Sequence, residues 1–131
     1  MSDSSGAIGV VVAHGAMAEG LVSAARRIAG GSADGLRALS NDGKGPAQLR
    51  SELDEIAGDD RAVVFVDLQS GSCGMAALSC CRDSLRRVVV CGVNLPMLLD
   101  FVFNRDAPLE ELAVRLVEKG RAAIVPSGPK P

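Results

Sequence analysis

The sequence has a single histidine, His14, and contains neither tryptophan nor tyrosine. Its only aromatic residues are three phenylalanines, so it lacks the aromatic surface on which nucleic-acid bases and sugar rings usually stack. The sequence also has no large excess of charge of one sign, since 14 Lys and Arg and 16 Asp and Glu give a formal charge of −2. Both features argue against nucleic acid as a partner.

Long hydrophobic runs and a basic N-terminus are absent as well. The apolar run at residues 7–13 is far shorter than the ~20 residues that a membrane helix needs. Residues 1–5 hold no Lys or Arg, which a secretory signal would carry at its start. The chain has 131 residues, of which 47% are hydrophobic, which suffices for one packed core. We therefore expect a single domain over residues 1–131, soluble and cytoplasmic.

The cysteines do not form a metal-binding pattern. No two of them have the C-x-x-C spacing, and one histidine does not complete a common zinc set. We expect free thiols in a reducing compartment, and neither a metal nor a cofactor. The cysteines are Cys73, Cys80, Cys81 and Cys91.

Apolar segments typical of buried strands alternate with segments of helical spacing. Because each helix would separate two strands, the pattern predicts an α/β fold, a doubly wound, mostly parallel sheet with helices on both faces. We expect residues 127–131 to be a frayed tail. The expected strands are residues 7–13, 35–40 (a weak candidate), 61–67 and 87–93. The first three expected helices start at Met17, Pro46 and Cys73, and the third ends at Ser84. The last two expected helices follow N-caps at Asn94 and Asp106, and the final one runs to about Lys119.

In such a fold, ligands bind at the carboxyl ends of the strands. His14 follows the first strand, and Asp67 ends the strand over residues 61–67. If these strands are neighbours, the carboxylate can accept the N–H of one imidazole nitrogen and leave the other as a nucleophile. The structural alternatives are an ordinary polar loop histidine and an aspartate that only caps the next helix.

The turn at residues 70–74 can be compared with three catalytic motifs. Ser70 stands where the G-x-S-x-G elbow needs glycine, and the only histidine precedes it, which argues against a serine hydrolase. The turn lacks the G-K-[ST] end of a phosphate-binding Walker loop. Cys80 and Arg86 have the C-x5-R spacing of cysteine phosphatases but lie in or near a predicted helix. The remaining interpretation is an oxyanion nest of backbone N–H groups and the Ser72 hydroxyl, with Cys73 either activated or a small filler.

Four segments together resemble the enzyme IIA component of the mannose-type bacterial phosphotransferase system. The resemblance spans nearly the whole chain in order and spacing, and its most specific part is G-V-N-L-P-M-L at residues 92–98. The other parts are V-V-V-A-H-G at 10–15, V-F-V-D-L at 64–68, and Gly71-Ser72 with Ala76-Ala77.

The resemblance implies a homodimer in which His14 accepts a phosphoryl group from the phosphocarrier HPr and passes it to enzyme IIB. It implies that Asp67 orients the imidazole and that Ser72 binds phosphate. We add the backbone N–H groups at Gly15 and Gly71 to the phosphate site. We expect that no metal takes part and that the membrane is involved only indirectly, through transporter subunits.

Some positions differ from the family pattern, and the differences bear on the partner surface. Gln69, Ser70, Cys73 and Met75 stand where the family usually has an aromatic residue, Gly, Pro and Asn. We assign Asn94 and Met97 to the rim that faces partners.

Two alternatives to sugar transport stay open. One is a stand-alone regulatory phosphoprotein of an incomplete phosphotransferase chain, and the other is a small-ligand binding module that is not phosphorylated. The apolar stretch at residues 121–125 is expected to be an edge strand exchanged between subunits of a dimer, or else the end of the last helix.

Overall fold

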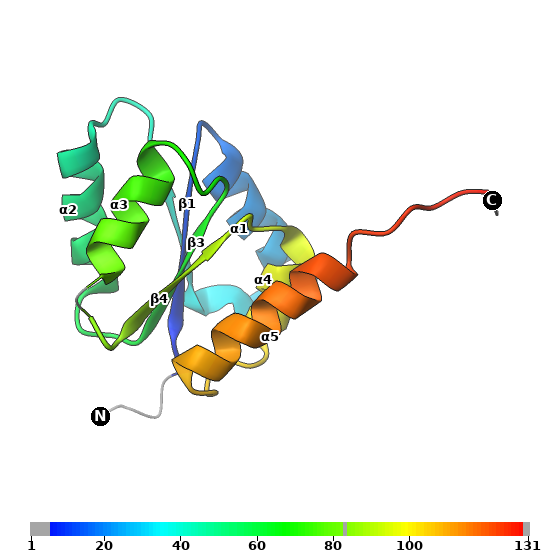
Figure 1. Ribbon diagram of the computed structural model, residues 1–131. Coiled ribbons are helices and arrows are strands. Elements are labelled where there is room, and N and C mark those ends of the chain that lie inside the picture. The colour runs from blue at the N-terminus through cyan, green and yellow to red at the C-terminus, as the bar shows by residue number, and fades with distance from the viewer. Residues whose placement is uncertain (1–5, 83, 130–131) are drawn as a thin grey trace.

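The computed structural model describes residues 6–82 and 84–129 and contains a single open sheet covered by helices (Figure 1). Residues 1–5, 83 and 130–131, which include part of the expected tail, lie outside the described residues. The elements in chain order are β1 (Ile8–Ala13), α1 (Met17–Ala29), the 3-10 helix η1 (Gly30–Gly35), β2 (Leu36–Ser40), α2 (Pro46–Ala57), β3 (Ala62–Val66), α3 (Ser72–Cys81), β4 (Arg87–Cys91), α4 (Leu95–Val102) and α5 (Leu109–Ala122).

The four described strands form a parallel sheet in the order β2-β1-β3-β4. In the register, Val11 of β1 lies beside Phe65 of β3, which in turn lies beside Val90 of β4. Every residue of β1 and β3 is buried, because both strands are central and covered on both faces. The edge strands β2 and β4 are only partly buried. The predicted parallel α/β sheet is confirmed.

Helices cover both faces of the sheet, as the doubly wound prediction requires. Buried side chains of α2 and α3 pack with Val10, Val12, Val64 and Val66 in one core. Buried side chains of α1, α4 and α5 pack with Val11, Val63 and Phe65 in the other. Figure 1 shows the same division, with α2 and α3 on one side of the strands and α5 on the opposite side.

Close packing of β1 against α4 requires a residue without a side chain at Gly9. The Phe65 and Phe101 rings meet edge to face, with centroids 5.3 Å apart. A Cβ built on Gly9 would lie 2.7 Å from the Phe101 ring and 2.9 Å from the Leu36 side chain. Gly9 therefore lets the aromatic pair pack directly over the centre of the sheet.

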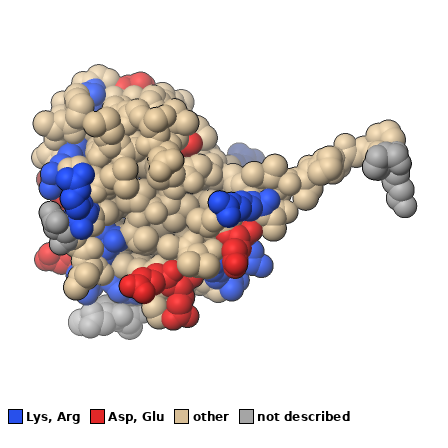
Figure 2. Space-filling view, viewed as in Figure 1, with Lys and Arg blue, Asp and Glu red and all other residues tan. Residues whose placement is uncertain are grey.

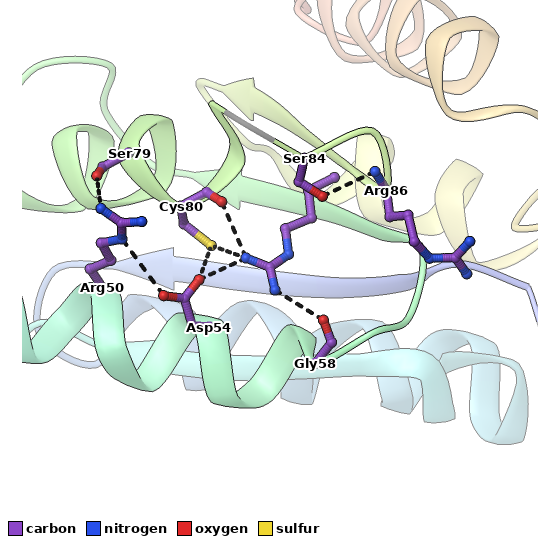
Figure 3. A network of polar contacts seen from close by, with 8 residues as sticks. Arg50, Asp54, Gly58, Ser79, Cys80, Ser84 and Arg86 are labelled. Atoms are coloured by element: carbon purple, nitrogen blue, oxygen red, sulfur yellow. Dashed lines mark hydrogen bonds and ion pairs between the residues drawn. The ribbon is translucent and has the colours of Figure 1, made fainter.

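A polar network ties the far ends of α2 and α3 to β4 (Figure 3). Arg87 donates to Asp54 Oδ1 at 2.7 Å, to the Gly58 carbonyl at 2.9 Å and to Cys80 Sγ at 2.9 Å. The Cys80 thiol donates to Asp54 Oδ1 at 3.2 Å. Burial, and the hydrogen bond to Asp54, raise the pKa of Cys80. Cys80 therefore has a structural role. Its predicted helical position, which argued against a phosphatase loop, is confirmed, whereas Arg86 lies in the turn before β4 and not in a helix.

Several predicted boundaries are wrong. The helix expected over residues 73–84 spans Ser72–Cys81, and β4 ends at Cys91 rather than at residue 93. The last helix begins at Leu109 with Pro108 as its N-cap, so Asp106 is not the cap. Asp106 lies instead in the turn that the Asn104 carbonyl closes with the Ala107 N–H.

The C-terminal segment also differs from the expectation. Arg121 and Ala122 are the last residues of α5, and the described chain beyond them is extended and leaves the body of the molecule (Figure 1). The side chains of Ile124 and Val125 are 76% and 68% exposed. Of the two predictions for residues 121–125, the continuation of the last helix is therefore correct for Arg121 and Ala122. The apolar side chains of Ile124 and Val125 are exposed in the single chain.

None of the helices in the described residues is both long and apolar enough to cross a bilayer. All four cysteines are free thiols, as predicted.

Candidate functional site

His14 and Asp67 meet where the order of the strands reverses. The chain leaves β1 for β2 on one side, and the next strand, β3, lies on the other side of β1. Loops that follow β1 and β3 therefore diverge and leave room at the carboxyl edge of the sheet, the usual ligand position in open α/β folds. His14 lies in the loop after β1, and Asp67 directly follows β3.

Two hydrogen bonds join His14 to one oxygen of Asp67. The His14 backbone N–H donates to Asp67 Oδ2 at 3.0 Å, and the ring Nδ1 lies 2.8 Å from the same oxygen. The His14 side chain is 44% exposed, whereas that of Asp67 is only 10% exposed. The neighbouring strands thus produce the predicted pair, with an accessible imidazole held by a largely buried carboxylate.

The carboxylate remains ionised at neutral pH. Partial burial opposes its ionisation, but the hydrogen bonds from the His14 backbone and ring, together with the charge of that ring, lower the pKa of Asp67. When the ring is neutral, an ionised Asp67 favours the tautomer in which Nδ1 donates to it and Nε2 keeps its lone pair. Its other oxygen, Oδ1, is buried and has no hydrogen-bond partner among the described residues.

The turn after His14 is held by two residues that the sequence analysis missed. Gly15 has a φ of +59°, and its N–H donates to Asn41 Oδ1 at 3.2 Å. The Ser40 hydroxyl donates to the Gly15 carbonyl at 2.8 Å. Ser40 is the last residue of β2 and Asn41 follows it, and the sequence pattern of this strand is weak. The polar turn S-N-D-G at residues 40–43 was the one signal that pointed to them.

The start of α3 faces the outer edge of the imidazole. Gly71 has a φ of +102°, and a Cβ built on it would lie 3.9 Å from His14 Nε2. Ser72 is the first residue of α3, so the first N–H groups of this helix lack partners within it. Free N–H groups and the positive end of a helix dipole are suited to an anion, and here they lie near Nε2.

Cys73, the second residue of α3, is fully buried. Its Sγ is 3.8 Å from His14 Nδ1. Burial, and next the charge of Asp67, raise the pKa of Cys73. The sequence analysis had considered that its position at the start of a helix could activate Cys73 as a thiolate, and the raised pKa argues against this.

The two residues assigned to a partner surface have other positions. Met97 is 3% exposed and packs in the core, so its assignment to the rim is wrong. The Asn94 amide caps α4 by accepting the Met97 N–H at 3.1 Å, and it donates to the Gly120 carbonyl at 2.9 Å. Asn94 therefore joins α4 to the end of α5.

Charge is scarce where the strands end. Neither Lys nor Arg occurs at residues 13–17, 67–74 or 92–97. Figure 2 shows few charged side chains on the upper part of the viewed face, toward which the strands run, and more on the lower part. The loops after β1, β3 and β4 therefore offer an anion backbone N–H groups and hydroxyls rather than cationic side chains, and Lys44, which follows β2, pairs with Glu52.

Comparison with known proteins supports one family. The family model of the phosphotransferase system fructose IIA component matches residues 9–117. No functionally curated protein matched the sequence. Three of the solved structures that share the fold are each at most 24% identical to this chain.

These structures cover most of the chain. The mannose/sorbose-specific IIA subunit from Enterococcus faecalis has a TM-score of 0.85 and 24% identity, over 97% of this chain and 98% of that chain. The phosphotransferase component EIIA from Streptococcus agalactiae has a TM-score of 0.84 and 22% identity, over 91% and 95%. The IIA protein associated with the fucose utilization operon of Streptococcus pneumoniae has a TM-score of 0.75 and 24% identity, over 92% and 93%.

The family model extends from β1 through most of α5 and so includes both strand ends that carry His14 and Asp67. The chain therefore belongs to the enzyme IIA family of the phosphotransferase system, a membership that supports a phosphocarrier role in a sugar phosphotransferase system.

Proposed function

We propose that this protein accepts a phosphoryl group on His14 Nε2 from phospho-HPr and passes it to an enzyme IIB component. The observation that carries the proposal is the 2.8 Å contact between His14 Nδ1 and the buried Asp67 carboxylate. That contact fixes the tautomer in which Nε2 is a nucleophile, and it stabilises the ring when phosphorylation gives it positive charge. The exposure of the imidazole gives a partner protein direct access.

In the transfer step, the Nε2 lone pair attacks phosphorus as the bond from phosphorus to the donor histidine breaks. The N–H groups at Gly71 and Ser72 and the Ser72 hydroxyl take the developing charge on the phosphoryl oxygens. Gly15 gives its N–H to Asn41, so its contribution is the shape of the turn. Transfer to IIB is the reverse process, in which Nε2 is the leaving group. Because both donor and acceptor hold reactive phosphoryl groups, transfer needs positioning more than bond activation.

The same proposal places the protein in the cytoplasm, with contact to the membrane only through transporter subunits. It also includes a homodimer. The exposed Ile124 and Val125 follow α5 as an extended segment, and such a segment suits pairing with the sheet edge of a second subunit. Along the outer face of α5, Ala113, Val114 and Val117 line a shallow hollow of about 350 Å³ that adds apolar surface for the partner.

The experiment is phosphorylation of the full chain with phosphoenolpyruvate, enzyme I and HPr. We expect one acid-labile, base-stable phosphoryl group per chain, and none on His14→Ala with an unchanged circular dichroism spectrum. Adding enzyme IIB should then remove the group from the wild type. Labelling of His14→Ala would refute the site, and a phosphoryl group that no IIB accepts would favour the regulatory alternative. A wild type that accepts no phosphoryl group would favour the small-ligand module.

A further inference from the structure

Three metal-ligating side chains converge at the edge of the sheet from three separate elements. His14 follows β1, Asp67 follows β3, and Cys73 lies in the first turn of α3. One ligand atom from each residue lies within 4.8 Å of the other two. Imidazole, carboxylate and thiolate are the three side-chain ligands that zinc prefers.

Two of the three separations can be compared directly with those of a tetrahedral site, and the third, between Asp67 and Cys73, is at most 4.8 Å. Nδ1 and Sγ are 3.8 Å apart, which for bond lengths of about 2.1 and 2.3 Å corresponds to an angle of about 120° at the metal. Nδ1 and Asp67 Oδ2 are 2.8 Å apart, which corresponds to about 85° for the same type of bonds. Opening this pair by about 0.6 Å gives the tetrahedral angle, and a small rotation of the 44% exposed His14 ring would supply it.

A second observation at the same place points to a cation. The Asp67 side chain is nine-tenths buried, and its Oδ1 has no hydrogen-bond donor within the part of the chain that the structure describes. Buried carboxylate oxygens are nearly always paired, and an orphaned one calls for a partner such as water or an ion. Within the same residues, His14 is the only ion-pair partner of Asp67. Neither lysine nor arginine compensates this carboxylate.

We propose that His14, Asp67 and Cys73 bind one zinc ion, and that the bound ion blocks phosphoryl acceptance. The sequence analysis predicted no metal because it considered only ligands at short spacing in the chain. These three ligands lie on three separate elements, so their spacing gives no such signal. Zinc bonds to Sγ with release of the thiol proton, and to Nδ1, whose former proton is replaced by one taken up at Nε2. The Nε2 lone pair is then used for that N–H bond, so the ring is no longer a nucleophile. The exposed side of the imidazole leaves a fourth position for water.

Binding is tested on the full chain with metal alone. Cobalt(II), a spectroscopic substitute for zinc, should bind one ion per chain and give a thiolate charge-transfer band. Cys73→Ser and Cys73→Ala should lose the band and bind zinc at least about 100-fold more weakly, because loss of a ligand exceeds the 10–100-fold effect of losing an outer partner. Cys81→Ser, which changes a thiol at the other end of α3, is the matched control and should keep both. Absence of the band from the wild type, or its loss in the control alone, would overturn the site.

The regulatory part rests on the proposed function and has its own readout. Saturating zinc should slow labelling by phospho-HPr at least tenfold in the wild type, and less than twofold in Cys73→Ser in the same mixture. Equal slowing of both proteins would place the effect on enzyme I or HPr and overturn the regulation. Stoichiometric zinc with undiminished labelling would also overturn it and leave the metal site standing. Failure of labelling without zinc would instead refute the phosphocarrier proposal, while the cobalt spectrum would still decide the site.

Discussion

Two helical glycines should respond in opposite directions to the same substitution. Gly20 lies in α1, where a Cβ built on it would have nothing within 4 Å, whereas Gly74 lies in α3 against the loop that follows β3. A Cβ on Gly74 would collide with the Gln69 carbonyl oxygen, and it would lie 2.7 Å from the Gln69 carbonyl carbon and 2.9 Å from the Leu68 carbonyl oxygen. These are backbone atoms, which cannot turn aside as a side chain can.

The expected magnitudes follow from these surroundings. In an exposed helix, Gly→Ala stabilises by about 0.5–1 kcal/mol, so Gly20→Ala should raise the melting temperature by about 2–5 °C. Gly74→Ala has the same intrinsic gain, but overpacking costs about 1–3 kcal/mol even where side chains can adjust. With backbone as the obstacle we expect a net loss of about 2 kcal/mol, or about 6–10 °C.

Gly74→Ala should also affect the site, because the displaced loop begins at Asp67. The assays are thermal and urea unfolding followed by circular dichroism, and the initial rate of labelling by phospho-HPr. Gly20→Ala, the matched control, should keep the wild-type labelling rate. A Gly74→Ala protein as stable as Gly20→Ala would show that α3 does not pack on this loop as described.

Further predictions concern the pair at the site, the thiol, the polar network and the C-terminus. Asp67→Asn should slow phosphoryl acceptance at least tenfold, because it no longer stabilises the charged ring, and unchanged kinetics would make Asp67 a mere structural residue. Without added metal, Cys73→Ser should accept phosphoryl within a few-fold of the wild-type rate, and loss of all labelling in a folded variant would revive a cysteine mechanism. Burial opposes ionisation of Asp54, but hydrogen bonds from Arg87 and Cys80 and nearby guanidinium charges lower its pKa. This contribution to stability is present above the ordinary aspartate pKa and disappears as the pH falls through the lowered value. In urea unfolding, the wild type should therefore lose more stability between pH 7 and about 3 than Arg87→Met does, and equal losses would contradict the network. Light scattering should give about twice the 13.4 kDa chain mass, and removal of residues 121–131 should shift it toward monomer; a monomeric wild type at tens of micromolar would refute the dimer.

The sheet and the His14–Asp67 contact were predictable for one physical reason. Strands buried on both faces must be apolar at every position, so β1 and β3 stand out from the sequence. The residues that end them are then placed at one edge by parallel topology alone. The contact itself needs only that these two strands be neighbours, and they are.

The details that depend on side-chain packing were not predictable in this way. Met97 lies in α4, which is apolar on nearly all sides. The hydrophobic pattern of this helix therefore does not distinguish its buried positions from its exposed ones. Asn41 reaches Gly15 from the end of an edge strand with a weak pattern. The approach of Cys73 to His14 depends on the path of the loop between β3 and α3, which no spacing rule describes.

The most direct test of the proposed function is to identify which imidazole nitrogen carries the phosphoryl group. The 15N-labelled chain is phosphorylated with phosphoenolpyruvate, enzyme I and HPr, and long-range 1H–15N NMR correlations then assign the ring nitrogens of His14. Because Asp67 holds Nδ1 at 2.8 Å, phosphorylation is expected at Nε2, with the Nδ1 proton protected from exchange. A phosphoryl group on Nδ1, or phosphorylation at any residue other than His14, would contradict the account.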